Sequence, residues 1–145
     1  MSGMGSLYQE LILDLSKHPR AKGLHEGADA SSHQINPTCG DEVTVQLHLD
    51  GDVVRTVRWD GEGCAISQAS ASILADLAPG LTVDDLRARI ELFRTAMRSK
   101  GRIEPDEELL GDAVALGGVS KYTARVKCAM LPWVAAEDAL ATRAR

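Results

Sequence analysis

The alternation of hydrophobic and polar residues predicts a β-hairpin in the first half of the chain. Apolar residues occupy every second position across 43–49, residues 50–52 have the composition of a tight turn, and a second extended stretch covers 53–59. Asp60-Gly61 has turn composition as well, so we predict that a short third strand follows it and ends near Cys64. These three strands are expected to form an antiparallel sheet.

The segment 20–37 lacks such alternation and consists largely of Gly, Ala, Ser, Asp and His. We therefore predict a long loop that leads to Cys39. If the strands run antiparallel, the end of the third strand lies close to this loop, and Cys64 approaches Cys39 although 25 positions separate them in the sequence.

Apolar residues at helical spacing predict three helices next to these strands. The first covers 7–15 and ends before Pro19. The second follows Cys64, with Ser67 as its N-cap, and stops at the Pro-Gly pair of residues 79–80. The third has Thr82 as its N-cap and carries an apolar stripe that we assign to the core: Val83, Leu86, Ile90, Phe93 and Met97.

Two further helices are predicted in the last third of the chain. An acidic start at 106–108 opens a helix that ends before Gly117. The last helix runs from about Ser120 to Leu140 and contains Pro132, and its buried face is expected to comprise Tyr122, Val126, Met130 and Trp133. The fold class is therefore α+β, with a three-stranded antiparallel sheet packed against a set of helices in a single domain covering 1–145.

Composition and charge exclude several classes of protein. The 145 residues, 44% of them hydrophobic, suffice for one core without disulfides. The net charge of −5 argues against a nucleic-acid partner, because binding phosphates requires a basic surface. The longest apolar stretch is shorter than the roughly 20 residues of a membrane span, and residues 1–6 contain no basic segment followed by an apolar one, so we expect no membrane-spanning segment. We expect a cytoplasmic protein, in a compartment where thiols stay reduced.

The three cysteines, Cys39, Cys64 and Cys128, are the main chemical signal in the sequence. Three thiols cannot all pair in disulfides, whereas three thiolates and one carboxylate complete a four-coordinate metal shell. Asp41, two residues after Cys39, is the candidate fourth ligand. Each cysteine taken alone is better explained as a small buried apolar residue. Taken together in these turn-rich surroundings, they indicate a metal site that suits Zn²⁺.

Histidines leave the fourth ligand open at this stage. His25 and His33 lie in the predicted loop before Cys39, so either of them, or water, is an alternative to Asp41. His48 falls on the polar side of its strand and is expected to be solvated. The sequence contains no Ser-His-Asp order, P-loop or Gly-x-Gly-x-x-Gly run, which removes the commonest hydrolase and nucleotide-binding interpretations.

Three segments around the cysteines resemble the signature blocks of the IscU/NifU N-terminal family of iron–sulfur cluster assembly proteins. They are Asn-Pro-Thr-Cys-Gly-Asp at 36–41, Gly-Glu-Gly-Cys-Ala-Ile-Ser-Gln-Ala-Ser at 61–70, and Arg-Val-Lys-Cys-Ala-Met-Leu at 125–131. Scaffold-type members carry histidine immediately before the third cysteine, where this chain has Lys127. Together with the long connection around 98–116, this difference resembles the SufU-type branch. Thr123 stands where the family often has proline.

The resemblance implies a zinc-dependent sulfurtransferase that accepts persulfide sulfur from a SufS-type cysteine desulfurase and passes it to a downstream iron–sulfur scaffold. It implies zinc ligation by Cys39, Asp41, Cys64 and Cys128. Cys39, on its glycine-flanked loop, is then the expected sulfur acceptor, and Arg125 is expected to stabilise negative charge beside it.

Two alternatives remain at the level of the sequence. The same four ligands could assemble a transient iron–sulfur cluster, which would make the protein a scaffold, although Lys127 argues against this. A purely structural zinc module is the other alternative, but it does not account for a carboxylate ligand beside a glycine.

Overall fold

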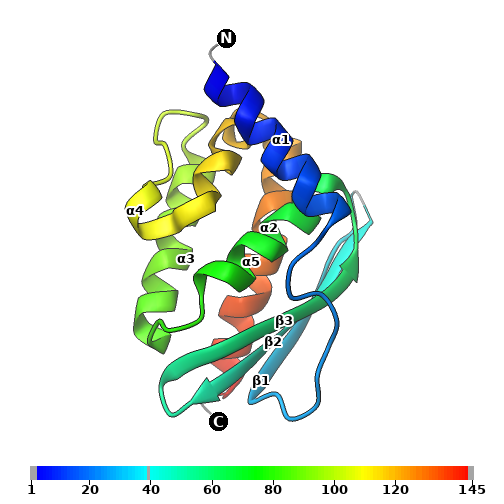
Figure 1. Cartoon of the computed structure of the whole chain (residues 1–145), viewed down its shortest axis with the longest axis vertical. Coiled ribbons are helices and arrows are strands. Elements are labelled where there is room, and N and C mark those ends of the chain that lie inside the picture. The colour runs from blue at the N-terminus through cyan, green and yellow to red at the C-terminus, as the bar shows by residue number, and fades with distance from the viewer. Residues whose placement is uncertain (1–2, 39, 144–145) are drawn as a thin grey trace.

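A three-stranded antiparallel sheet and a layer of helices make up the computed structural model of the chain, which describes residues 3–38 and 40–143 (Figure 1). The strands lie in the order β1 (Ala30–Asn36), β2 (Asp41–Asp50) and β3 (Val53–Glu62). Two helices pack on the sheet: α5 (Thr123–Arg143) contacts β1 and β2, and α2 (Ala65–Leu77) contacts β3. The predicted α+β class and the three-stranded sheet are confirmed.

The predicted hairpin is confirmed, but the prediction of the third strand is wrong. β3 continues through Asp60-Gly61 without a turn, and the third strand is β1, inside the segment predicted as a loop. β1 pairs with β2 from Ala30 opposite Leu47 to Asn36 opposite Asp41. Its sequence, Ala-Ser-Ser-His-Gln-Ile-Asn, is too polar to give a hydrophobic alternation, as is common for edge strands.

The alternation in β2 decides which face of the sheet meets the helices. Val43, Val45 and Leu47 are buried, and they lie on the same side of the strand because side chains alternate between the two faces. Asp41 belongs to this odd-numbered set and is also buried. The first residue of β2 therefore places a carboxylate on the helix-facing side of the sheet.

The remaining long helices close the core. α1 (Gly3–Lys17) packs on α2, and α3 (Val83–Arg98) packs on α5. The predicted apolar stripe of α3 is buried in full, and Thr82 caps the helix by accepting a hydrogen bond from the amide of Asp85. Phe93 stacks on Trp133 with ring centroids 4.2 Å apart. Within the described residues, none of the helices combines the length and apolarity needed to cross a membrane.

The helix predicted to start at 106–108 is interrupted. α4 (Glu107–Leu110) has four residues, and the chain continues as the 3₁₀ helix η1 (Gly111–Lys121). Gly111 has a φ of 55°, which other residues rarely adopt and which stops the α-helix there. α5 begins only at Thr123, so Tyr122 precedes it and is 65% exposed, contrary to its predicted place in the core.

The outer face of the sheet is partly covered by the segment between α1 and β1. Gly23 donates to the carbonyl of Trp59 on β3, and the amide of His25 donates to the side chain of Gln46, so the segment crosses from the β3 edge towards β1 (Figure 1). His48, predicted to be solvated, is only 5% exposed and lines a hollow of about 290 Å³ together with His25. Its burial follows from this crossing segment, which strand periodicity does not reveal.

Candidate metal centre

Asp41 enters the site from the sheet. A turn joins β1 to β2, and the amide of Gly40 donates to the carbonyl of Asn36 (2.8 Å). Asn36 is itself buried, and its side-chain oxygen accepts from the amide of Thr38 (3.2 Å). Asp41 then starts β2 on the helix-facing side and is 3% exposed. A carboxylate so deeply buried requires polar or metal partners, because burying a charge without them is costly.

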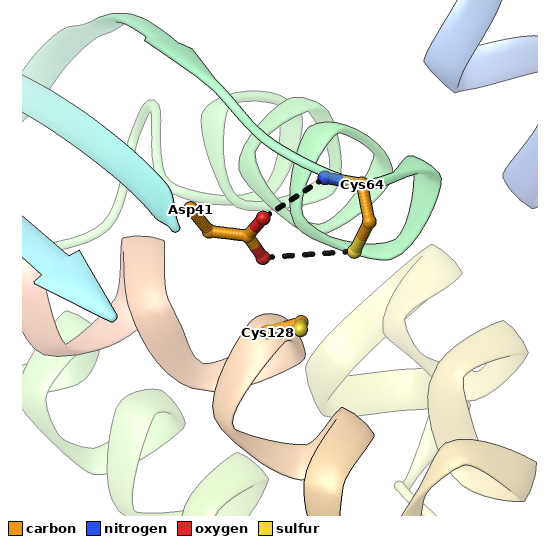
Figure 2. A group of neighbouring side chains, drawn as sticks. All are labelled: Asp41, Cys64 and Cys128. Atoms are coloured by element: carbon orange, nitrogen blue, oxygen red, sulfur yellow. Dashed lines mark hydrogen bonds between the residues drawn. The ribbon is translucent and has the colours of Figure 1, made fainter. Parts of the chain in front are cut away.

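Cys64 enters the site where β3 gives way to α2. It occupies the N-cap position of α2 with extended backbone angles and makes no side-chain cap. Its amide donates to Oδ1 of Asp41 (3.1 Å), and its Sγ lies 3.6 Å from Oδ2 of the same carboxylate (Figure 2). Because the N-terminal end of a helix favours negative charge, this position suits both the carboxylate and a thiolate.

Cys128 enters the site from α5. It lies in the second turn of that helix, is 2% exposed, and has its Sγ 3.9 Å from the carbonyl oxygen of Ala124. Figure 2 shows it below Asp41 and Cys64, opposite both side chains. The site is therefore formed by three elements that are distant in the sequence: the start of β2, the start of α2 and the first part of α5.

The donor set fits zinc. One oxygen of Asp41 and the sulfurs of Cys64 and Cys128 all lie within 4.8 Å of one another. Ligands of a tetrahedral Zn²⁺ with thiolate and carboxylate donors are roughly 3.5–4 Å apart, given metal–ligand distances of about 2.0–2.3 Å. The three side chains therefore need to move by no more than about 1 Å to share an ion. Two soft sulfurs with one oxygen favour Zn²⁺ over Mg²⁺ or Ca²⁺.

Three of the four predicted ligands are thus brought together. Cys39 lies outside the described residues, so its ligation and its role as sulfur acceptor stay predictions. In the sequence a single residue, Gly40, separates it from Asp41. A fourth ligand is required for a closed zinc shell.

The alternative histidine ligands lie outside this group of side chains. Nδ1 of His33 is 2.8 Å from the hydroxyl of Thr44, and its Nε2 is 3.7 Å from Glu42. His25 lines the hollow with His48. In the part of the chain that the structure describes, the group of side chains able to hold a metal contains Asp41, Cys64 and Cys128 and no histidine.

Arg125 lies on the first turn of α5, one turn before Cys128, and is exposed. Its predicted role in stabilising negative charge stays a prediction. Its position on the same helix as Cys128 is compatible with that role.

Ser67 has a different role from the one predicted. It is not the N-cap of α2 but lies within its first turn, where its hydroxyl donates to the carbonyl of Cys64 (3.0 Å) and lies 4.0 Å from the sulfur. Gly63, which precedes Cys64, faces both Ser67 and the Asp41 carboxylate. Sequence reasoning assigned neither residue to the site, although both fall within the matched segment 61–70.

Comparison with known proteins identifies relatives along almost the full length of the chain. Residues 7–129 match the model of the NifU-like N-terminal domain. The chain is 39% identical over 141 residues to the zinc-dependent sulfurtransferase SufU of Bacillus subtilis, covering 97% of this chain and 93% of that protein. It is 33% identical to the iron–sulfur cluster assembly scaffold protein IscU of Streptococcus pyogenes, covering 97% and 86% respectively.

A solved structure shares the fold. The crystal structure described as a putative iron–sulfur cluster assembly scaffold protein for the SUF system of Fervidobacterium islandicum superposes with a TM-score of 0.79. It is 37% identical in sequence, and the match covers 93% of this chain and 97% of that one. The arrangement of sheet and helices is therefore that of these assembly proteins.

Proposed function

The chain belongs to the family of NifU-like N-terminal domains, and from this membership we propose that it is a zinc-dependent sulfurtransferase of iron–sulfur cluster biogenesis. It accepts persulfide sulfur from a cysteine desulfurase of the SufS type and delivers it to a downstream iron–sulfur scaffold. The observation that carries the proposal is the convergence of Asp41, Cys64 and Cys128 in a chain 39% identical to a zinc-dependent sulfurtransferase.

Zinc is held by Asp41, Cys64, Cys128 and Cys39 in this proposal. When bound, Zn²⁺ keeps its cysteine ligands deprotonated while making them weaker nucleophiles. The chain itself supplies two thiols on helix-bearing elements and one buried carboxylate. Because Cys64 and Cys128 are fixed by α2 and α5, the third cysteine, Cys39, which falls between β1 and β2 in the sequence, is the one suited to meet a partner.

The sulfur transfer is an exchange between a thiolate and a persulfide. The Cys39 thiolate attacks the terminal sulfur of the persulfide on the desulfurase cysteine. A new sulfur–sulfur bond forms on Cys39, the bond within the partner's persulfide breaks, and the partner's cysteine departs as a thiolate. No external oxidant or reductant is needed for this step. Arg125, exposed on the same helix as Cys128, supplies positive charge near the developing Cys39 persulfide.

The test is a desulfurase assay with and without this protein. Cysteine-dependent sulfide release in the presence of a reductant is expected to rise when the zinc-loaded protein is added, and Cys39→Ala should abolish the increase. Thr38→Ala, which changes the exposed neighbouring residue, is the matched control and should retain it. Undiminished stimulation by Cys39→Ala with zinc still bound would contradict the assignment.

A second candidate function rests on the scaffold relative from Streptococcus pyogenes. In that case the same residues assemble a transient iron–sulfur cluster. Metal analysis of the purified protein separates the two: bound zinc in a colourless protein supports sulfur transfer, whereas bound iron with visible absorbance supports the scaffold. Lys127, in place of the histidine of scaffold-type members, favours the first outcome.

A further inference from the structure

We propose that Gly63 is a positioning residue of the metal centre: the absence of its side chain lets the Asp41 carboxylate reach the amide of Cys64 and so present its second oxygen to the metal. The inference rests on the proposed zinc site and assigns a role to a residue that is not itself a ligand.

A side chain at position 63 would collide with residues of the site. A β-carbon built on Gly63 would lie 2.9 Å from Oδ1 and 3.0 Å from Cγ of Asp41, and it would overlap the hydroxyl of Ser67. Ordinary contacts of a β-carbon are 3.4 Å or longer. Even alanine would therefore force the carboxylate, the serine hydroxyl or both to move.

The requirement is for space and not for an unusual backbone conformation. The φ angle of Gly63 falls outside the left-handed region, unlike that of Gly40 (77°) or Gly111 (55°). An alanine at 63 therefore carries no backbone penalty of the kind that usually explains glycine in a turn. Any effect of Gly63→Ala comes from the side chains that the new methyl group meets.

The two neighbours differ in how they can respond. Ser67 can rotate its hydroxyl away, at the cost of its hydrogen bond to the carbonyl of Cys64. Asp41 has a short side chain at the buried start of β2, and its Oδ1 is the atom that accepts from the Cys64 amide. Displacing this oxygen breaks that bond and turns Oδ2 away from the Cys64 sulfur, now 3.6 Å distant.

The Asp41–Cys64 bond acts as the orienting contact of a metal ligand. Groups that hydrogen-bond to metal ligands fix their direction, and losing such a group typically costs about 10–100-fold in metal affinity. In this chain the orienting donor is a backbone amide at the start of α2, so no substitution removes it directly. A side chain added at Gly63 disturbs this hydrogen bond indirectly, by displacing the carboxylate.

The experiment is a double-mutant cycle on zinc release. Zinc-loaded full-length proteins carrying Gly63→Ala, Asp41→Ala, or both are mixed with a chelating dye, and the rate of zinc loss is measured. All are made in a Ser67→Ala background, which removes the hydroxyl overlap and leaves the contact with Asp41. Gly118→Ala is the control, because a β-carbon there meets nothing within 4 Å.

We expect Gly63→Ala to speed zinc loss by about 10-fold when Asp41 is present and to add nothing in the Asp41→Ala protein. Equal acceleration in both backgrounds, or none in either, would overturn the role of Gly63. If Asp41→Ala itself leaves zinc loss unchanged, the carboxylate ligand of the proposed function fails, which is a separate result read from the single variant.

Thermal unfolding of the same proteins without metal gives a second measurement. The Tm should fall more when Gly63→Ala is introduced beside Asp41 than beside Asp41→Ala, because only the first pairing crowds the carboxylate. This comparison holds even if Gly63→Ala is too unstable to load with zinc. An identical fall in both backgrounds would contradict the proposal.

Discussion

The contact between α2 and α5 has two ends that differ in how their polar groups are satisfied. At one end Ser70 donates to the carbonyl of Ala129 (2.5 Å) and accepts from Nε1 of Trp133 (2.8 Å), and all three residues are fully buried. We call this the Ser70 network. Nearer the start of each helix, Cys64, six residues before Ser70, and Cys128, directly before Ala129, lie together with Asp41.

The difference indicates that the two ends have separate roles: one stabilises the fold and the other binds metal. In the Ser70 network every polar side-chain atom has a protein partner, so this end contributes to the fold whether or not metal is present. At the cysteine end two sulfurs and a carboxylate meet, a set whose chemistry is completed by a metal. The network fixes α2 against α5 and thereby sets the distance between the two thiols before any metal binds.

Trp133→Ala should be the most damaging change, because it removes the ring that stacks on Phe93 and the donor to Ser70. The free energy of unfolding is expected to fall by about 3–5 kcal/mol. Urea titration of the metal-free protein measures it. A loss that appears only in the zinc-loaded protein would place Trp133 in the metal site instead of the fold.

Cys128→Ala should lower the stability of the zinc-loaded protein much more than that of the metal-free protein. The stabilisation that zinc gives at 100 times its Kd, about 2.7 kcal/mol, should disappear. The metal-free protein should change by only about 1 kcal/mol, because a sulfur is exchanged for a small void. Thermal unfolding with and without added zinc measures both quantities. A large loss without metal would mean that Cys128 is mainly a core residue.

Ser70→Ala should weaken the fold by about 2 kcal/mol, because it leaves the indole N–H of Trp133 and the carbonyl of Ala129 without their partner. The stabilisation added by zinc should stay nearly the same, since the thiols remain on intact helices. If zinc stabilisation is lost as well, the two ends are not separable and the comparison fails.

Arg125→Gln should give the smallest effect, confined to sulfur transfer. An exposed charge contributes up to about 1 kcal/mol, so the rate is expected to fall by about two- to fivefold, and less at high salt. Stimulation of a desulfurase at two ionic strengths measures this. Arg98→Gln, an exposed arginine at the end of α3, is the control and should leave the rate unchanged.

Most of the helices could be predicted from the sequence because their signals are local. Thr82 and the spacing of apolar residues define α3 without any tertiary information. The hairpin of β2 and β3 was equally visible, since apolar residues alternate with polar ones along β2. The break at Gly111 was missed because a glycine inside a periodic apolar segment does not by itself indicate a positive φ.

The predictions that were wrong concern residues whose structure depends on partners distant in the sequence. β1 is a strand because its backbone pairs with β2, and its polar side chains carry little trace of this. His48 is buried because the segment before β1 crosses the sheet. At the metal centre, Asp41, Cys64 and Cys128 could be predicted as ligands from the chemistry of their side chains. The close approach of Gly63 to the carboxylate of Asp41, 22 residues earlier, could not be predicted, because it depends on the three-dimensional fold.

We propose that Cys39 receives the sulfur while Cys64 and Cys128 hold the metal. The direct measurement is mass spectrometry of the zinc-loaded protein after reaction with a SufS-type desulfurase and cysteine, with thiols and persulfides trapped by alkylation. We expect one additional sulfur on the peptide that contains Cys39 and none on the peptides of Cys64 and Cys128. An additional sulfur on either of those two, with Cys39 unmodified, would contradict it.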